Sequence, residues 1–201
     1  MKRSFTQVIK NAKQLICTVI LTTIFLTIHG VTIEASNVIK MKTLRSPKEQ
    51  IKLVINGSGD YKIEGAKPAT IGNGEAILTL TSQNVNIIGD ITKFDCSDND
   101  LNSLDVSGCI TLTELLCYEN SLTELLLDKN SNLVNLSCDY NSIESLDLSH
   151  NPLLKDLLCP YNRIKHLDLR NNKQLTSLYC FSNQIEDIQL ADENAIEEIL
   201  C

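Results

Sequence analysis

Apolar residues recur along the second half of the chain at a fixed interval. Between residues 94 and 201 the same series of Leu, Ile and Val positions returns every 21 residues, with no residue inserted or lost. Each copy holds two similar halves, LxxLxCxxN and LxxLxLxxN. Self-similarity at a period of roughly 20 to 50 residues is typical of solenoids, in which stacked turns bury a continuous core. The pattern therefore predicts a linear array of about five turns.

Two columns of identical residues accompany the apolar positions. Cysteines repeat every 21 residues, and asparagines follow three residues behind them. The cysteines are Cys96, Cys117, Cys138, Cys159, Cys180 and Cys201, and the asparagines are Asn99, Asn120, Asn141, Asn162 and Asn183. A second asparagine column, Asn130, Asn151 and Asn172, lies in the other half of the unit, where the first copy has Cys109. Because a buried amide can satisfy backbone groups, each asparagine is expected to mark a bend.

The residues around each cysteine predict a short strand. Leu115 and Cys117 flank Leu116, and alternate side chains of a strand point to opposite faces, so the flanking pair is expected to face the core. Stacked turns then form a parallel sheet with a spacing of about 4.8 Å. Too few residues remain in a turn for a substantial helix, so the convex side is expected to be extended or 3₁₀. The predicted fold is a leucine-rich repeat solenoid with strands on its concave face.

Three states are open to the cysteines. A zinc site is disfavoured, because the CxxC pairs and accompanying His residues that such sites use are missing. Disulfides within the column are disfavoured, because bonded Cβ atoms lie about 3.8 Å apart whereas stacked strands are about 4.8 Å apart. A small, soft thiol packs well in a narrow coil. We therefore expect buried free thiols, seven of them once Cys17 has left with the N-terminal segment.

The first 35 residues have the pattern of an export signal. A basic start is followed by the apolar run LICTVILTTIFLTI and a small residue, Ala35. Such a run is short for a membrane span, which needs about 20 residues, so a cleaved signal peptide over 1–35 is favoured over an uncleaved anchor. No membrane insertion is expected after cleavage. Residues 36–49 are polar and mixed, and predict a linker.

Residues 50–93 show the alternation of a sheet. Ile51, Leu53 and Ile55 alternate with more polar neighbours, GSGD at 57–60 reads as a hairpin-like turn, and two further strands are predicted at 76–81 and 84–89. So short a segment can hardly bury a core of its own. We interpret it as a β cap on the N-terminal end of the array over 94–201, with a separate carbohydrate or adhesion module as the alternative.

Charge and motifs exclude several classes of function. The chain carries a net charge of −7, and removal of residues 1–35 leaves 14 basic and 24 acidic residues. This acidity disfavours nucleic acid and anionic membranes as partners. No GxSxG or HExxH motif occurs, and the chain is not expected to be an enzyme or to hold a cofactor. DxDxN at residues 98–102 opens like a calcium loop, but Ser103 and Cys109 replace the required Gly and Glu, so turn chemistry is favoured and no metal is expected.

The outward positions of the cysteine strands are unusually aromatic. Five of the seven aromatic residues beyond residue 35 fall on this face, where the core does not need them. The candidate binding residues on the concave face are Leu116, Tyr118, Glu119, Asp139, Tyr140, Leu158, Tyr161, Tyr179 and Phe181. The alternative is the preference of aromatic residues for exposed sheets. Protein binding is the favoured interpretation.

The repeat resembles a known family. Copies such as NSLTELLLDKNSNLVNLSCDY and NSIESLDLSHNPLLKDLLCPY are similar to the cysteine-containing 21-residue bacterial leucine-rich repeats of internalin-like surface proteins and leucine-rich surface antigens. The resemblance covers residues 94–201. It implies a secreted or cell-surface protein, often an adhesin for a host or neighbouring-cell surface protein, and it supplies no catalytic residue.

The sequence therefore supports an exported, non-catalytic, protein-binding solenoid. One alternative is a structural spacer or assembly module whose uncovered end, 199–201, is its important surface. Others are a fragment of a larger surface protein, because no polar cap follows Cys201, and an inhibitor of secreted enzymes.

Overall fold

The computed structural model describes residues 27–28, 31–32 and 37–201. Thr27–Ile28 (β1) and Val31–Thr32 (β2) pair as two antiparallel strands. The predicted signal peptide and its cleavage after Ala35 otherwise lie outside the described residues. Among the described residues, no helix has the length and apolar character needed to cross a membrane. The remaining strands belong to one compact unit, Ser36–Cys201.

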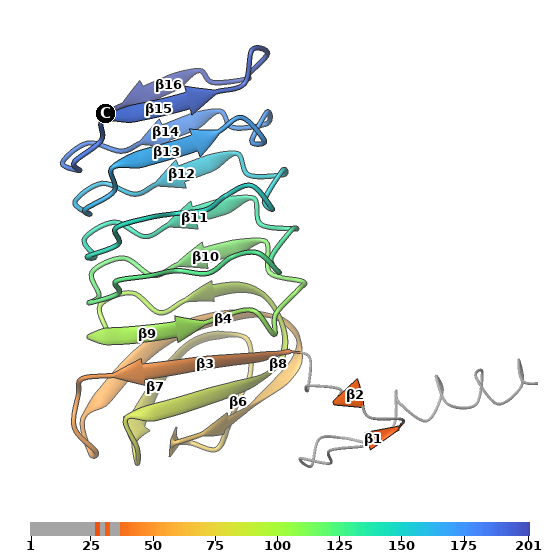
Figure 1. Cartoon of the computed structure of the whole chain (residues 1–201). Helices are drawn as coiled ribbons and strands as arrows, with labels where there is room; N and C mark the ends of the chain where they lie inside the picture. The colour runs from red at the N-terminus through yellow and green to blue at the C-terminus, as the bar shows by residue number, and fades with distance from the viewer. Residues whose placement is uncertain (1–26, 29–30, 33–36) are drawn as a thin grey trace, which may run out of the picture. The chain divides into compact units, whose positions relative to one another are not determined.

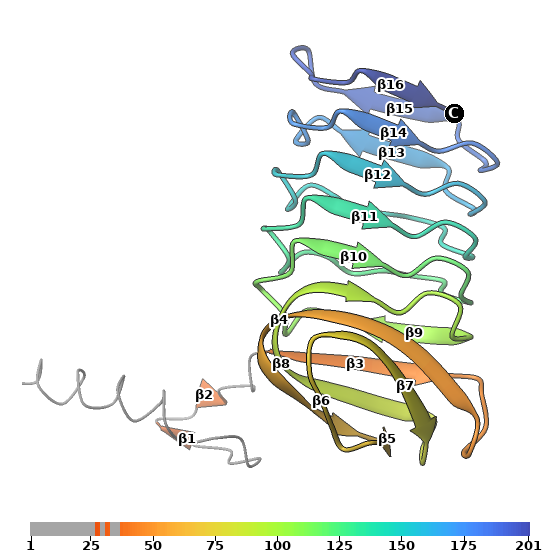
Figure 2. The ribbon, with the colours of Figure 1, turned by 180° about the vertical axis from the view of Figure 1, so that it is seen from behind.

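Parallel rungs form the sheet of the array, stacked one above the other (Figures 1 and 2). We call each short strand with its following cysteine a rung. The aligned residues Phe94, Leu115, Leu136, Leu157, Leu178 and Ile199 show that successive rungs are offset by one sequence period. The rungs are the end of β8 (Asn84–Asp95), then β10 (Glu114–Leu116), β11 (Asn135–Ser137), β12 (Asp156–Leu158), β14 (Ser177–Tyr179) and β16 (Glu198–Leu200). The predicted leucine-rich repeat β-solenoid is confirmed.

The opposite side, which we call the convex wall, is extended. Its strands are β9 (Leu101–Asp105), β13 (His166–Leu169) and β15 (Asp187–Leu190), of which β13 and β15 pair in parallel. The chain then returns to the next rung through two successive turns, in which Asn130 N–H donates to Leu127 O and Leu133 N–H donates to Asn130 O. No residue in 37–201 is helical, as the short period predicted.

The core is a set of apolar columns that run the length of the array. One turn contributes Leu112, Leu115, Cys117, Leu122, Leu125 and Leu127, each at most 3% exposed. Full burial of a Leu side chain stabilises a fold by roughly 1.5–3 kcal/mol. Each turn can bury this surface only against its neighbours, so the turns stabilise one another.

The first asparagine column ties every turn to the one before it. Asn141 Nδ2 donates to the carbonyl oxygens of Cys117, Cys138 and Asp139 at 2.9, 3.1 and 3.2 Å, and its Oδ1 accepts from Leu122 N–H at 2.9 Å. The residue before each of these asparagines has a positive φ, 51° at Tyr140. The left-handed residue turns the chain, and the asparagine satisfies the backbone groups that the turn leaves unpaired.

The second asparagine column also joins neighbouring turns, but only through its Nδ2 groups, because the buried Oδ1 atoms of Asn130, Asn151 and Asn172 have no hydrogen-bond partner. Asn151 Nδ2 donates to Leu127 O at 3.1 Å and to Asn130 O at 2.9 Å, and Asn172 repeats this one turn later. Asn130 reaches back to Val106 O and Cys109 O. Both asparagine columns therefore lie where the chain changes direction and bind the backbone there.

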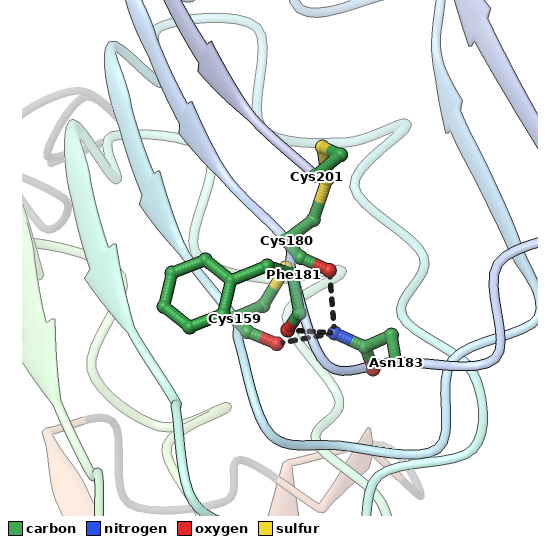
Figure 3. Close-up of a disulfide and its surroundings, with 5 residues drawn as sticks. All are labelled: Cys159, Cys180, Phe181, Asn183 and Cys201. Atoms are coloured by element: carbon green, nitrogen blue, oxygen red, sulfur yellow. Dashed lines mark hydrogen bonds between the residues drawn. A yellow bond between two sulfur atoms is a disulfide. The ribbon is translucent and has the colours of Figure 1, made fainter.

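One covalent bond joins two members of the cysteine column. Cys180 and Cys201 form a disulfide between the last two rungs (Figure 3). The prediction of free thiols is wrong for this pair, whereas Cys96, Cys109, Cys117, Cys138 and Cys159 are free and buried.

The separation of the Cα atoms of neighbouring rungs, and not the spacing of the strands compared with a bonded Cβ separation, decides whether a disulfide can form. A disulfide requires Cα atoms roughly 4.4–6.8 Å apart, and the Cα atoms of Cys180 and Cys201 are 4.6 Å apart, so neighbouring rungs meet the requirement. Cys180 is buried but Cys201 is exposed, and the exposed side chain has room to turn towards its neighbour. The interior cysteines are enclosed by rungs on both sides.

The β cap is built around one long strand. β4 (Gln50–Glu64) pairs antiparallel with β8 on both sides of residues 57–60, so the predicted hairpin turn there is wrong. The chain forms a bulge instead, with a register shift between Ser58 and Lys62. Gly59 supplies a φ of +88°, and a Cβ at Gly57 would lie 1.8 Å from Asp90 O, so both glycines serve the bulge. The other strands are β5 (Ala66–Lys67), β6 (Thr70–Ile71) and β7 (Gly74–Leu80).

Residues 36–49 are not a linker throughout. Val38–Thr43 form strand β3, which pairs antiparallel with β8 in the cap and with β9 in the first turn of the array. Its side chains alternate, with Ile39, Met41 and Thr43 buried and the two lysines between them exposed. Lysines and threonine make the composition of VIKMKT polar, so composition predicts a linker although the apolar and polar positions alternate.

The cap and the array are joined by strands and polar contacts. β8 is antiparallel to β4 and β3, and its last residues are also the first parallel rung. Asn99 accepts from Lys52 N–H at 2.9 Å and donates to Lys52 O at 2.7 Å, so the first asparagine of the column binds the backbone of the cap. Arg45 provides a second polar link between the cap and the array. Its guanidinium donates to the Asp100 carboxylate, Asp98 O and Gln50 O at 2.7–2.8 Å.

Candidate protein-binding surface

The outward side of the rungs and of the bends after them forms one surface, which we call the strand face. It comprises residues 93, 95, 97 and 98 and their equivalents at steps of 21. All nine predicted binding residues lie on it. Leu116, Leu158 and Tyr179 end their strands, and the residues after the cysteines and in the bends are Tyr118, Asp139, Phe181, Glu119, Tyr140 and Tyr161.

Three aromatic residues of this face touch one another. The rings of Tyr140 and Tyr161 are stacked, with centroids 4.2 Å apart and planes 16° apart. The Tyr161 and Phe181 rings meet edge to face at 5.4 Å and 82°. The three residues are 48%, 41% and 36% exposed. We call Tyr140, Tyr161 and Phe181 the aromatic cluster.

The backbone holds the stacked pair in place. Tyr140 and Tyr161 occupy equivalent bends with φ values of 51° and 53°. Tyr140 N–H donates to Pro160 O and Tyr161 N–H donates to Phe181 O, both at 3.1 Å. Because identical bends are stacked at the spacing of the sheet, their side chains are presented in parallel. The hydrogen bond with Tyr161, aided by partial burial and nearby carboxylates, raises the pKa of the Tyr140 hydroxyl.

The other predicted residues lie around the cluster and not in it. Leu116, Tyr118 and Tyr179 are half-buried against the sheet. A hydrogen bond with Glu198 is the main cause that raises the pKa of the Tyr179 hydroxyl. Asp139 accepts a hydrogen bond from Ser137 Oγ at 2.5 Å, which fixes its carboxylate beside Tyr140.

One exposed apolar residue of the face was missed. Leu200 aligns with Tyr179 in the parallel register and is 49% exposed. The 21-residue step from Tyr179 is the signal that places Leu200 on this surface. The sequence-based interpretation places residues 199–201 only at an uncovered end.

The DxDxN segment at the start of the array is part of the junction with the cap. Arg45 Nε lies 2.8 Å from Asp100 Oδ2, and Arg45 Nη2 lies 3.7 Å from Asp98 Oδ1. Within residues 37–201, no cluster of three or more His, Cys, Asp or Glu side chains has the arrangement of a metal site. The carboxylates of Asp98 and Asp100 pair with the guanidinium of Arg45.

No family model matches the sequence, and no curated protein matches it. Among solved structures, the functional domain of InlJ from Listeria monocytogenes, described as including a cysteine ladder, is similar with 28% sequence identity and a TM-score of 0.39. The similarity covers 54% of this chain and 31% of that chain, so this chain spans less than a third of the length of its neighbour.

Proposed function

We propose that the protein is an exported adhesin-type module that binds another protein through its strand face. The observation that carries the proposal is the aromatic cluster, which is exposed and ordered on a rigid sheet. The N-terminal signal pattern and the resemblance of the repeat support a secreted or cell-surface location. The proposed role is binding without catalysis.

Exposed aromatic rings that are already ordered are well suited to binding a protein. Large aromatic side chains dominate the energy of protein interfaces, and they lose little conformational entropy on binding when they are already ordered. Tyr140 and Tyr161 are held by backbone hydrogen bonds and by each other. A preference for β-structure does not explain their position, because both residues lie in left-handed bends and not within a strand.

The test compares a double variant with a single control variant. Tyr140→Ser with Tyr161→Ser removes the stack, and the change suits the backbone because Ser182 occupies the equivalent left-handed position with a φ of 55°. Leu126→Ser is the control, since Leu126 is the most exposed apolar side chain of the convex wall at 68%. The full chain is screened by interferometry against a panel of purified bacterial and host surface proteins, and each partner found is titrated with the variants.

We expect the double variant to bind such a partner at least about tenfold more weakly, as loss of a hot spot does, and Leu126→Ser to bind like the parent. Circular dichroism of both variants checks that they remain folded. Equal affinities of the parent and the double variant for the partner contradict the proposal.

A further inference from the structure

The charges of the strand face are almost all of one sign. Among its described positions the only cation is Lys93, whose Nζ lies 3.0 Å from the Glu114 carboxylate. The acids of the face are Asp95, Asp98, Glu114, Glu119, Asp139, Asp156 and Glu198. Asp98 faces Arg45 and Glu114 faces Lys93, which leaves an acidic border on the rungs beside the aromatic cluster.

Two of these acids lie next to the stacked rings. Asp139 precedes Tyr140 in the chain, and Glu119 occupies the equivalent bend one turn earlier. The negative charges of both carboxylates contribute to the raised pKa of the Tyr140 hydroxyl, after the larger effects of Tyr161 and of burial. Both acids are therefore close enough to act on whatever covers that ring.

From this juxtaposition we propose that the partner is a basic segment of a protein, whose arginine or lysine side chains pack on Tyr140 and Tyr161 between the carboxylates of Glu119 and Asp139. The inference rests on the proposed function and names the chemistry of the partner. A guanidinium stacks on an aromatic ring and donates to flanking carboxylates at the same time. A neutral glycan could also stack on the rings, but it gains nothing from an acidic border.

The dimensions of the face fit a short segment. Glu114 and Glu198 align on the same column, four rungs apart, which corresponds to about 19 Å at the spacing of a sheet. An extended chain covers this distance with roughly six residues. Such a segment can place two cations along the face, one near the aromatic cluster and one near Asp156 or Glu198.

The probe is a soluble octapeptide, Gly-Ser-Arg-Gly-Ser-Arg-Gly-Ser, titrated into the full chain and followed by calorimetry and by tyrosine fluorescence. The chain has five Tyr and no Trp, so its emission comes from tyrosine alone. A peptide with citrulline in place of both arginines is the neutral control. We expect the arginine peptide to bind at least about fivefold more tightly, with an affinity that falls as salt is raised.

Variants locate the binding. Glu119→Gln with Asp139→Asn should weaken binding of the arginine peptide several-fold and flatten its salt dependence. Glu124→Gln with Glu144→Gln makes the same change of net charge at exposed positions outside the strand face, and should leave the affinity unchanged. Tyr140→Ser with Tyr161→Ser should abolish the binding.

Three outcomes with the peptide probes overturn the inference. These are equal binding of the arginine and citrulline peptides, no binding of the arginine peptide at millimolar concentration, and loss of binding with the control pair as large as with Glu119→Gln and Asp139→Asn. Tyrosine-dependent binding of a neutral oligosaccharide such as maltohexaose, without binding of the arginine peptide, would identify a glycan site. Tyrosine-dependent capture of a neutral or acidic protein would overturn the basic partner and leave the proposed function standing.

Discussion

At the scale of single residues, the bend asparagines are the positions on which the array depends most. Asn162 donates to Cys138 O, Cys159 O and Pro160 O and accepts from Ile143 N–H. It is buried, so water cannot replace these contacts. Loss of its amide would leave the Ile143 N–H unsatisfied in the interior, at a cost of about 1–3 kcal/mol. Each of the three carbonyls would lose one of its two donors, because Cys138 O, Cys159 O and Pro160 O also accept from neighbouring turns.

We expect Asn162→Ala to lower the free energy of unfolding by about 3–5 kcal/mol, because the orphaned N–H costs about 1–3 kcal/mol and each lost hydrogen bond to a carbonyl contributes about 0.5–1.5 kcal/mol. Asn171→Ala is the matched control, because Asn171 is exposed and its Nδ2 makes one long contact, 3.4 Å from Ser149 O. Urea denaturation of both variants measures the difference. Similar losses in the two variants would contradict a special role of the bend amide.

The cysteine column predicts a map of thiol reactivity. Alkylation of the denatured chain without reductant should modify Cys96, Cys109, Cys117, Cys138 and Cys159 and leave Cys180 and Cys201 unmodified. Reduction before alkylation should add these two positions. Peptide mass spectrometry reads both results, and modification of Cys201 in the unreduced sample would show that the disulfide is absent.

The buried thiols also predict a dependence of stability on pH. Burial raises the pKa of the Cys109 and Cys159 thiols from 9.0 to about 12, and it raises the pKa of Cys96, Cys117 and Cys138 as well. Below pH 9.0 the thiols are protonated in both states and add no pH dependence. Above it the unfolded chain loses protons that the folded chain keeps, so stability falls by about 1.4 kcal/mol per pH unit for each thiol.

Urea denaturation at a series of pH values from about 8 to 11 tests this expectation. In Cys159→Ala the free energy of unfolding should fall less steeply with pH above pH 9.0, because one thiol no longer contributes to the decrease. This holds whatever the effect of the substitution on stability at neutral pH. An unchanged slope in the variant would show that Cys159 ionises as readily in the folded chain as in the unfolded chain.

At the scale of elements, the sequence revealed the array more clearly than the cap. The array repeats its pattern, so strands of three residues such as β10 could be placed by register alone. The cap has one copy of each strand. The alternation of β3 lasts only six residues and does not distinguish this strand from a linker. The glycines of the β4 bulge are the same residue type that a hairpin turn uses, so they do not distinguish a bulge from a turn. Tertiary pairing with β8 decides both cases, and local sequence does not contain it.

Arg45 provides a test of the junction between these elements. Its side chain is 25% exposed and donates to groups of the first turn and of β4. Arg45→Met keeps the aliphatic stem and removes these charge-assisted bonds, so we expect a loss of about 2–3 kcal/mol in the free energy of unfolding. Arg170→Met removes an exposed pair with Asp168, which solvent screens, and should destabilise the chain much less than Arg45→Met. Thermal unfolding compares the two, and equal losses would argue against the Arg45 clamp.

At the scale of the whole molecule, the two sides of the solenoid differ in chemistry. The strand face carries the aromatic cluster and a border of acids, whereas the convex wall mixes acids with Lys129, Lys173 and Arg170. The strand face could be predicted, because the period fixes which residues point outward. The contact between Tyr140 and Tyr161 could not, because it depends on the left-handed conformation of both bends. The Cys180–Cys201 bond was missed for a similar reason, since it depends on local freedom at one rung.

The Cys180–Cys201 disulfide also determines how the array bears mechanical load. A pull applied at Cys201 passes through the covalent bond to Cys180, so the residues between them carry no tension. Each earlier turn can peel away from its neighbour and release 21 residues, about 70 Å of extended chain. The bond thus makes the last turn a rigid handle and moves the first point of yielding inward, to the turn that ends at Cys180. In a reducing buffer, stretching should show one additional step of the same length.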